Sequence, residues 1–256
     1  MTTEPAVRRS ILVPIDLHGT SRGSLETLVR LARLLDRRLL GLLLDDIRLQ
    51  QVADLPFTTE ISLAGGRERN LLRDHLSQRQ TLVSGNTRRI LDDLAQHNRV
   101  ELAFENATGS RLRTSLERGG QLDIFFPARQ RWQLLAASRS ATGSAIRRLG
   151  IVLAGTAQDQ NVVETTRLLQ EARLVAEIYV ISVGPLDRSA LDKLYRPGSR
   201  ICVQANLRCE PKTIVQLVSQ SQYDLLLLPR DCLKGVPPEG LEAALDKASG
   251  QVLVIN

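Results

Sequence analysis

The chain is poor in cysteine, in aromatic residues and in long apolar runs. Its three cysteines and three histidines are too scattered for a disulfide framework or a zinc site. Aromatic residues make up 3% of the sequence, too little for the stacking surfaces that bind single-stranded nucleic acid. No apolar run approaches the roughly 20 residues that cross a bilayer, and residues 1–10 lack the apolar segment of a secretory signal. We therefore expect a cytoplasmic protein that binds neither metal nor membrane, with Cys202 as a small core residue of a strand.

The positive charge, +6 in total, is concentrated in the first part of the chain. Residues 1–148 carry 23 basic and 16 acidic side chains, whereas residues 149–256 carry 11 and 12. Such asymmetry can mark a region that binds a polyanion, which we keep as one alternative function. However, the arginines are interspersed with acids along helical stretches such as residues 30–37. We therefore interpret them as solvated helix faces, and nucleic acid is not an expected partner.

The stretch from Ile11 to Asp36 opens a parallel α/β sheet. Ile11 to Ile15 is a short apolar run typical of a buried strand. A polar loop follows, and from Leu25 the apolar residues recur at helical spacing. Ligands of such sheets bind at the carboxyl ends of the strands, so Asp16 is a candidate binding residue.

An internal repeat organises the remainder of the chain. The segments LDIFFPAR at 122–129 and YDLLLLPR at 223–230 share an aspartate, an apolar strand and a proline. Each is preceded by a strand and a helix, and a second strand–loop–helix pattern begins near Gly150. The sequence therefore predicts two tandem α/β domains, residues 1–148 and 149–256.

The connection at 45–66 is long for a compact domain, and helical material follows at 67–98. Gly85 and Asn86 are expected to break or bend this helix. Four apolar side chains of the connection could pack over the sheet or contact a partner, and both interpretations stay open: Leu55, Phe57, Ile61 and Leu63.

Three segments together resemble the universal stress protein family in its tandem form: ILVPIDLHGTSRGSLETLVRLA, RCEPKTIVQLVSQSQYDLLLLP and the terminal GQVLVIN. The resemblance implies two open, parallel, five-stranded sheets of the adenine nucleotide alpha hydrolase-like type. Each sheet would have the strand order 3-2-1-4-5 and helices on both faces. Many members of the family bind ATP through an aspartate after the first strand and a Gly-x2-Gly-x9-Gly-Ser/Thr motif after the fourth.

By this resemblance, Asp16 matches the aspartate that contacts adenine. Gly143 and Ser144 match the final Gly-Ser of the phosphate loop, and a helix beginning at Ser144 could direct N–H groups at a phosphate. The two earlier glycines of the motif fall at Gln130 and Gln133. The motif needs glycine there because the backbone must approach the phosphates without a Cβ atom. The first domain thus keeps only part of the pocket.

The second domain matches less of the motif. The position of Asp16 falls at Gly155 or Thr156, and Gly235 and Gly240 have the wrong spacing for the phosphate loop. We therefore expect this domain not to bind nucleotide in the family manner.

The join between the domains predicts a missing strand. SAIRRLG runs directly into IVLAGT, which already begins the second unit, so the first domain lacks its own fifth strand. Its fourth strand would then be an open edge unless the second domain or another chain covers it. We expect the two halves to pack as an intramolecular pseudo-dimer, and a homodimer of the whole chain stays open.

The sequence shows no serine elbow, no redox Cys-x-x-Cys motif and no acid–base partner for His18. Asp123 and Asp224 precede a strand in both repeats and are interpreted as structural. We therefore expect a non-catalytic binding or regulatory module in stress response, without a cofactor. The main alternative is a protein that binds ATP or AMP through Asp16, Gly143 and Ser144.

Overall fold

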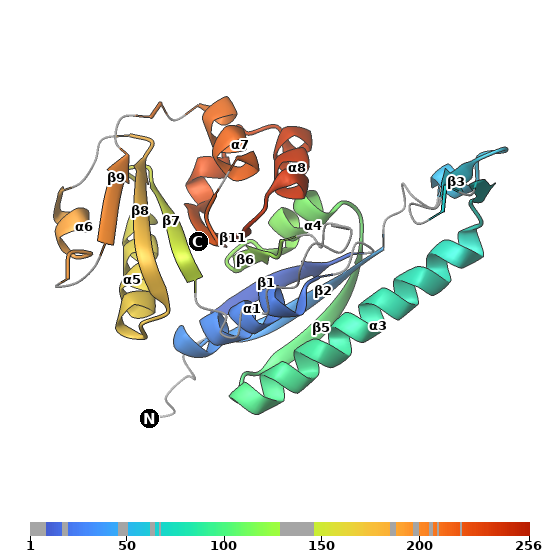
Figure 1. Ribbon diagram of the computed structural model, residues 1–256, viewed down its shortest axis with the longest axis horizontal. Helices are drawn as coiled ribbons and strands as arrows, with labels where there is room; N and C mark the ends of the chain where they lie inside the picture. Colours follow the sequence, from blue (N-terminus) through green and yellow to red (C-terminus); the bar gives the residue numbers. More distant parts are fainter. Residues whose placement is uncertain are drawn as a thin grey trace, which may run out of the picture.

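The chain folds into an α/β structure around one large sheet (Figure 1). The computed structural model describes residues 9–16, 20–45, 51–61, 65–66, 68–128, 146–184, 188–196, 200–204, 207–208, 210–220 and 222–256.

The N-terminal half contains six strands and three helices among the described residues, in addition to a short helical segment at 51–53. In chain order they are β1 (Ser10–Ile15), α1 (Arg22–Leu34), β2 (Arg38–Asp45), β3 (Thr59–Ile61), β4 (Glu68–Asn70), α3 (Arg73–Asn98), β5 (Leu102–Thr108), α4 (Arg111–Arg118) and β6 (Asp123–Phe126).

The C-terminal half alternates strands and helices more evenly. Its elements are β7 (Ile146–Leu153), α5 (Asp159–Glu171), β8 (Val175–Ser182), α6 (Arg188–Asp192), β9 (Arg200–Gln204), α7 (Pro211–Ser219), β10 (Leu225–Pro229), the 3-10 helix η1 (Arg230–Leu233), α8 (Pro238–Lys247) and β11 (Gln251–Ile255).

Both halves belong to a single nine-stranded sheet of order β5-β2-β1-β6-β11-β10-β7-β8-β9. This order differs from the two separate 3-2-1-4-5 sheets that the sequence predicted. All neighbouring strands are parallel except β6 and β11, which are antiparallel. The edge of β6 is therefore covered by the last strand of the C-terminal half. Because the direction reverses there, the carboxyl ends of the two groups of strands lie at opposite edges of the sheet.

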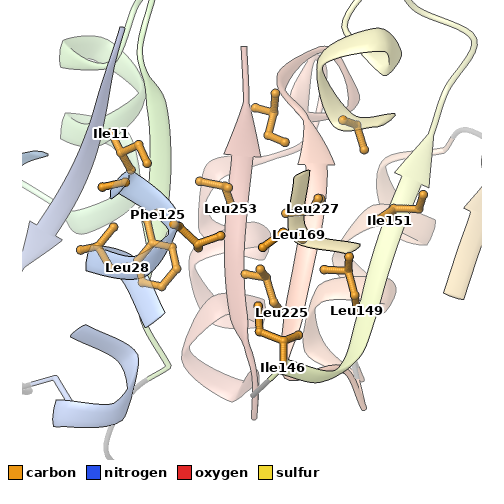
Figure 2. Packing of buried hydrophobic residues seen from close by; sticks show 14 of the residues in the cluster. Ile11, Leu28, Phe125, Ile146, Leu149, Ile151, Leu169, Leu225, Leu227 and Leu253 are labelled. Carbon is orange, nitrogen blue, oxygen red and sulfur yellow. The ribbon is translucent and has the colours of Figure 1, made fainter. Parts of the chain in front are cut away.

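Helices cover the sheet on both faces and create two apolar layers. On one face the core includes residues of α1, α3, α5 and α6, and on the other residues of α4, α7 and α8. The first layer continues across the join between the halves, where Phe125 of β6 is paired with Leu253 of β11. Figure 2 shows these two side chains between Leu28 of α1 and Leu227 of β10. The halves thus share one core.

Local sequence explains where the helices begin and how far they extend. Ser21 caps α1, because its Oγ accepts the N–H of Ser24 at 3.2 Å. The helix α3 runs without interruption from Arg73 to Asn98, so of the predicted break or bend at Gly85 and Asn86 the break does not occur. A glycine inside a helix costs only about 1 kcal/mol, which contacts of the rest of this long helix can offset.

The prediction that Cys202 is a core residue is also wrong. Cys202 lies in a strand, as expected, but it is exposed. Its strand, β9, forms the outer edge of the sheet, and most of its residues are exposed. The apolar residues of a strand do not show whether helices cover both of its faces.

Candidate functional site

The first candidate site lies at the carboxyl end of β1, where the strand order reverses between β2 and β6. Asp16 follows β1 directly and is half-buried. This is the position at which open α/β sheets bind ligands. Gly143 and Ser144 lie outside the described residues, so the structure does not place them relative to Asp16.

The predicted helix beginning at Ser144 is not present in the residues that follow. Ile146 to Leu153 forms the strand β7, which pairs with β8 and β10 in the middle of the C-terminal half. The first N–H groups of a helix point in one direction and lack partners within the helix, whereas the start of a strand has no such set of N–H groups. The helical part of the phosphate-binding arrangement is therefore missing beyond residue 145.

The carboxyl end of β6 is closed by internal contacts. The carbonyl oxygen of Pro127 accepts a hydrogen bond from Nη2 of the buried Arg111 at 2.7 Å. The same guanidinium lies 5.6 Å from the centre of the Phe126 ring. Proline has no N–H to donate, so this point of the backbone cannot bind a phosphate oxygen.

In the C-terminal half, the backbone N–H groups at the carboxyl end of β7 are bound by the carboxylate of Asp159. This carboxylate accepts the N–H of Ala154 at 3.0 Å and that of Gly155 at 2.8 Å. It also accepts the hydroxyl of Thr156 at 3.2 Å. Successive N–H groups at such a turn form an anion-binding concavity, and here the protein's own anion fills it. Asp159 also lies in the first turn of α5, where the helix dipole favours negative charge.

A backbone N–H group after the neighbouring strand β10 is also bound within the protein. The N–H of Asp231 donates to Oε1 of Gln158 at 2.9 Å, and the 3-10 helix η1 follows β10, at the position of the glycine motif that the resemblance implies. Sequence reasoning missed the role of Asp159. Its signal was the pair Thr156 and Asp159, spaced as in a capping motif before a helix.

The two repeated aspartates hold the structure together in different ways. Asp123 is buried, forms an ion pair with Arg37 and accepts the N–H of the terminal Asn256 at 3.0 Å. Burial lowers the pKa of Arg37 to about 10, so this guanidinium is still protonated at neutral pH. Asp224 is exposed and accepts the N–H of Arg148 at 2.9 Å.

A further cavity, of about 540 Å³, lies between α7 and the strands β8 and β9. The rings of Tyr179 and Tyr223 approach each other there with centroids 5.4 Å apart. A hydrogen bond to Glu177 raises the pKa of Tyr179, and burial raises the pKa of Tyr223. Both phenols are therefore protonated at neutral pH and cannot act as bases. The cavity is lined mainly by amide, hydroxyl and aromatic groups, which can hold a polar molecule by hydrogen bonds: Arg148, Tyr179, Gln204, Leu207, Thr213, Gln216, Leu217, Gln220, Gln222 and Tyr223.

Within the described ranges, no group of three or more histidine, cysteine or acidic residues could hold a metal ion. In the same part of the chain, no helix has the length and apolar character needed to cross a membrane. Comparison with protein-family models and with curated proteins gives no match to this chain.

Proposed function

We propose that the chain is a non-catalytic binding or regulatory module of the tandem universal stress protein type, cytoplasmic and active in stress response. The proposal includes the absence of family-type nucleotide binding. The observation that carries it is the position of Asp159, whose carboxylate binds the backbone N–H groups of Ala154 and Gly155 at the carboxyl end of β7, where the resemblance would place the adenine of a nucleotide.

Two further observations support the tandem part of the proposal. The repeated segments at 122–129 and 223–230 contain β6 and β10, and each of these strands lies parallel to the first strand of its half, β1 or β7. The two halves meet through an antiparallel pair of strands, β6 and β11. Such an arrangement suits a pseudo-dimer of related units.

The arginines support a solvated surface better than a polyanion-binding face. In the positively charged first part of the chain, Arg22 of α1 pairs with Glu26 at 3.1 Å and Arg113 of α4 pairs with Glu117 at 3.8 Å. Exposed pairs of this kind contribute little to stability, but they neutralise the charges that phosphates would need.

Titration calorimetry with MgATP and with AMP tests the proposal. We expect no micromolar binding by the full chain. The rival function, nucleotide binding by the N-terminal half, requires micromolar binding that is lost in Asp16→Ala and kept in Asp93→Ala. Asp93 is an exposed acid of α3, so it provides a matched control. That pattern would contradict the proposal.

Asp159→Ala tests directly whether this carboxylate keeps anions from the backbone N–H groups. Removing the carboxylate frees the N–H groups of Ala154 and Gly155. Inorganic phosphate should then raise the thermal midpoint of Asp159→Ala, because a ligand that binds only the folded state stabilises it. It should leave the wild-type midpoint unchanged. An equal increase in both proteins would show that the carboxylate does not block this site.

A further inference from the structure

The connection between β2 and α3 forms a projection that we call the arm, defined as the described residues of 51–82. Figure 1 shows the hairpin of β3 and β4 at the far end of α3, away from the large sheet. The hairpin is tied to the preceding turn by a hydrogen bond from the N–H of Leu71 to the carbonyl of Thr58, at 3.0 Å. The hydroxyl of Thr59 donates to Glu68 across the hairpin at 2.7 Å. The arm therefore contains regular, hydrogen-bonded secondary structure.

Most of the large apolar side chains that are exposed to solvent among the described residues belong to the arm. The exposed fractions at its tip are Val52 41%, Leu55 58%, Phe57 98%, Ile61 68% and Leu72 50%, with Leu82 at 73% further along α3. Outside the arm, only Tyr195 and Val203 are comparably exposed among the described residues. Phe57 also has a φ of 66°, a left-handed conformation that is uncommon for an aromatic residue. An apolar concentration of this kind marks an interaction surface.

The area suits a partner that presents the same surface. The five tip side chains expose the equivalent of about three whole large residues, on the order of 500 Å². Two such surfaces facing each other would bury about 1,000 Å², which reaches the lower limit of specific protein interfaces. One tip against an unrelated flat surface would give half of this apolar contribution.

The charge of the arm also favours a second copy. Residues 51–82 contain four acidic residues and four arginines, so the arm is neutral, whereas the whole chain carries +6. Two copies with net positive charge repel each other least where the approaching surfaces are neutral. An anionic membrane or a nucleic acid would instead be attracted by a net positive surface.

We propose that the arm is a dimerisation element, through which two copies of this chain pack tip to tip about a two-fold axis with Phe57 buried between them. A two-fold interface brings the same patch of both copies together, which the single apolar tip of each chain permits. Because β11 already pairs with β6, the edge of β6 is not open to a second copy, and the proposed contact uses the arm instead. The proposal is independent of whether the chain binds a nucleotide.

Sedimentation velocity of the full chain between about 1 and 100 μM, together with light scattering, measures the contact. We expect a concentration-dependent mass of twice 28.4 kDa. The decisive variant is Phe57→Asp, since aspartate tolerates the left-handed conformation and its charge cannot be buried in the contact. We expect its dimer dissociation constant to rise at least tenfold. Phe57 is almost fully exposed, so the far-UV spectrum should not change, and the thermal midpoint should not change at concentrations where both proteins are monomeric.

Tyr195→Asp is the matched control, because Tyr195 is an exposed aromatic residue that lies outside the arm. It should dimerise as the wild type does. A wild-type chain that is monomeric at 100 μM would overturn the proposal, as would a Phe57→Asp variant that dimerises as well as Tyr195→Asp. Monomeric wild type that co-sediments with phosphatidylglycerol vesicles, and loses this in Phe57→Asp, would assign the arm to a lipid surface instead.

Discussion

The two halves of the sheet are alike around their first strands and differ at their ends. In each half the first strand, β1 or β7, lies between the second strand and a later parallel strand, β6 or β10. The C-terminal half then places β11 beside β10. In the N-terminal half, β6 has this same β11 as its outer neighbour. One strand therefore completes both halves, and neither presents an open edge at the join.

The halves also differ in what connects their second and third strands. Between β2 and β5 the chain forms the arm and the 26-residue helix α3, whereas α6, between β8 and β9, has 5 residues. The longer insertion brings an exposed apolar tip to one half only. The N-terminal half therefore combines a neighbouring strand from the other half with an exposed apolar tip, and the C-terminal half supplies that strand.

The largest expected effect is that of Leu253→Ala in the shared strand. Leu253 is fully buried and opposite Phe125, so the substitution should destabilise the protein by about 2–5 kcal/mol. Because β11 belongs to both halves, urea unfolding should stay a single transition. Fluorescence of the tyrosines, all of which lie in the C-terminal half, should coincide with circular dichroism at 222 nm, to which α3 contributes strongly.

The exposed Leu82→Ala provides the control and should change the free energy of unfolding by less than about 0.5 kcal/mol. If the tyrosine signal and the helical signal of Leu253→Ala separated, the halves would unfold independently. The idea of a strand common to both would then be wrong.

An effect of similar size, and a sharper contrast, is expected from the two repeated aspartates. Asp123→Asn removes the charge that compensates the largely buried Arg37, and breaking such a pair costs about 3–5 kcal/mol. Asp224→Asn weakens a single hydrogen bond of an exposed carboxylate, worth about 1 kcal/mol. Urea denaturation of both variants measures the difference. Equal losses would mean that the repeated position has the same role in both halves.

The sequence predicted individual helices and strands better than it predicted which strands lie next to each other in the sheet. The strand at Ile11 to Ile15 and the helical pattern from Leu25 agree with the structure, because apolar runs and apolar periodicity are local properties. The antiparallel pair of β6 and β11 could not be predicted in the same way. Parallel and antiparallel neighbours show the same apolar run, and which two edges meet is decided by the packing of whole halves.

The candidate site was predicted only in part, for similar reasons. Asp16 was placed by its position after an apolar run, which the strand β1 confirms. The segment from Ile146 was assigned to a helix by analogy with the family motif. It is instead the strand β7, in which Arg147 and Arg148 near the start are exposed. The role of Asp159 depends on its hydrogen bonds to the backbone N–H groups of Ala154 and Gly155. Such hydrogen bonds cannot be predicted from the spacing of apolar residues.

The smallest predicted effect concerns Arg230, which follows the repeated strand β10 and connects the halves. Its Nη1 donates to the carbonyl of Gly119 at 2.6 Å, and its Nη2 donates to that of Leu116 at 2.6 Å. Both carbonyls belong to the C-terminal end of α4, where a positive charge is favourable.

Burial lowers the pKa of Arg230, yet the group stays protonated at neutral pH because an arginine starts far above it. Arg230→Ala should therefore cost about 1–2 kcal/mol in urea unfolding. The exposed Arg200→Ala, which loses only a pair with Glu177 at 3.5 Å, should cost about 0–0.5 kcal/mol. Arg230→Lys should fall between the two, because an ammonium cannot span both carbonyls as the planar guanidinium does. If alanine and lysine were equivalent at position 230, the contact between the halves would depend on side-chain packing and not on this pair of hydrogen bonds.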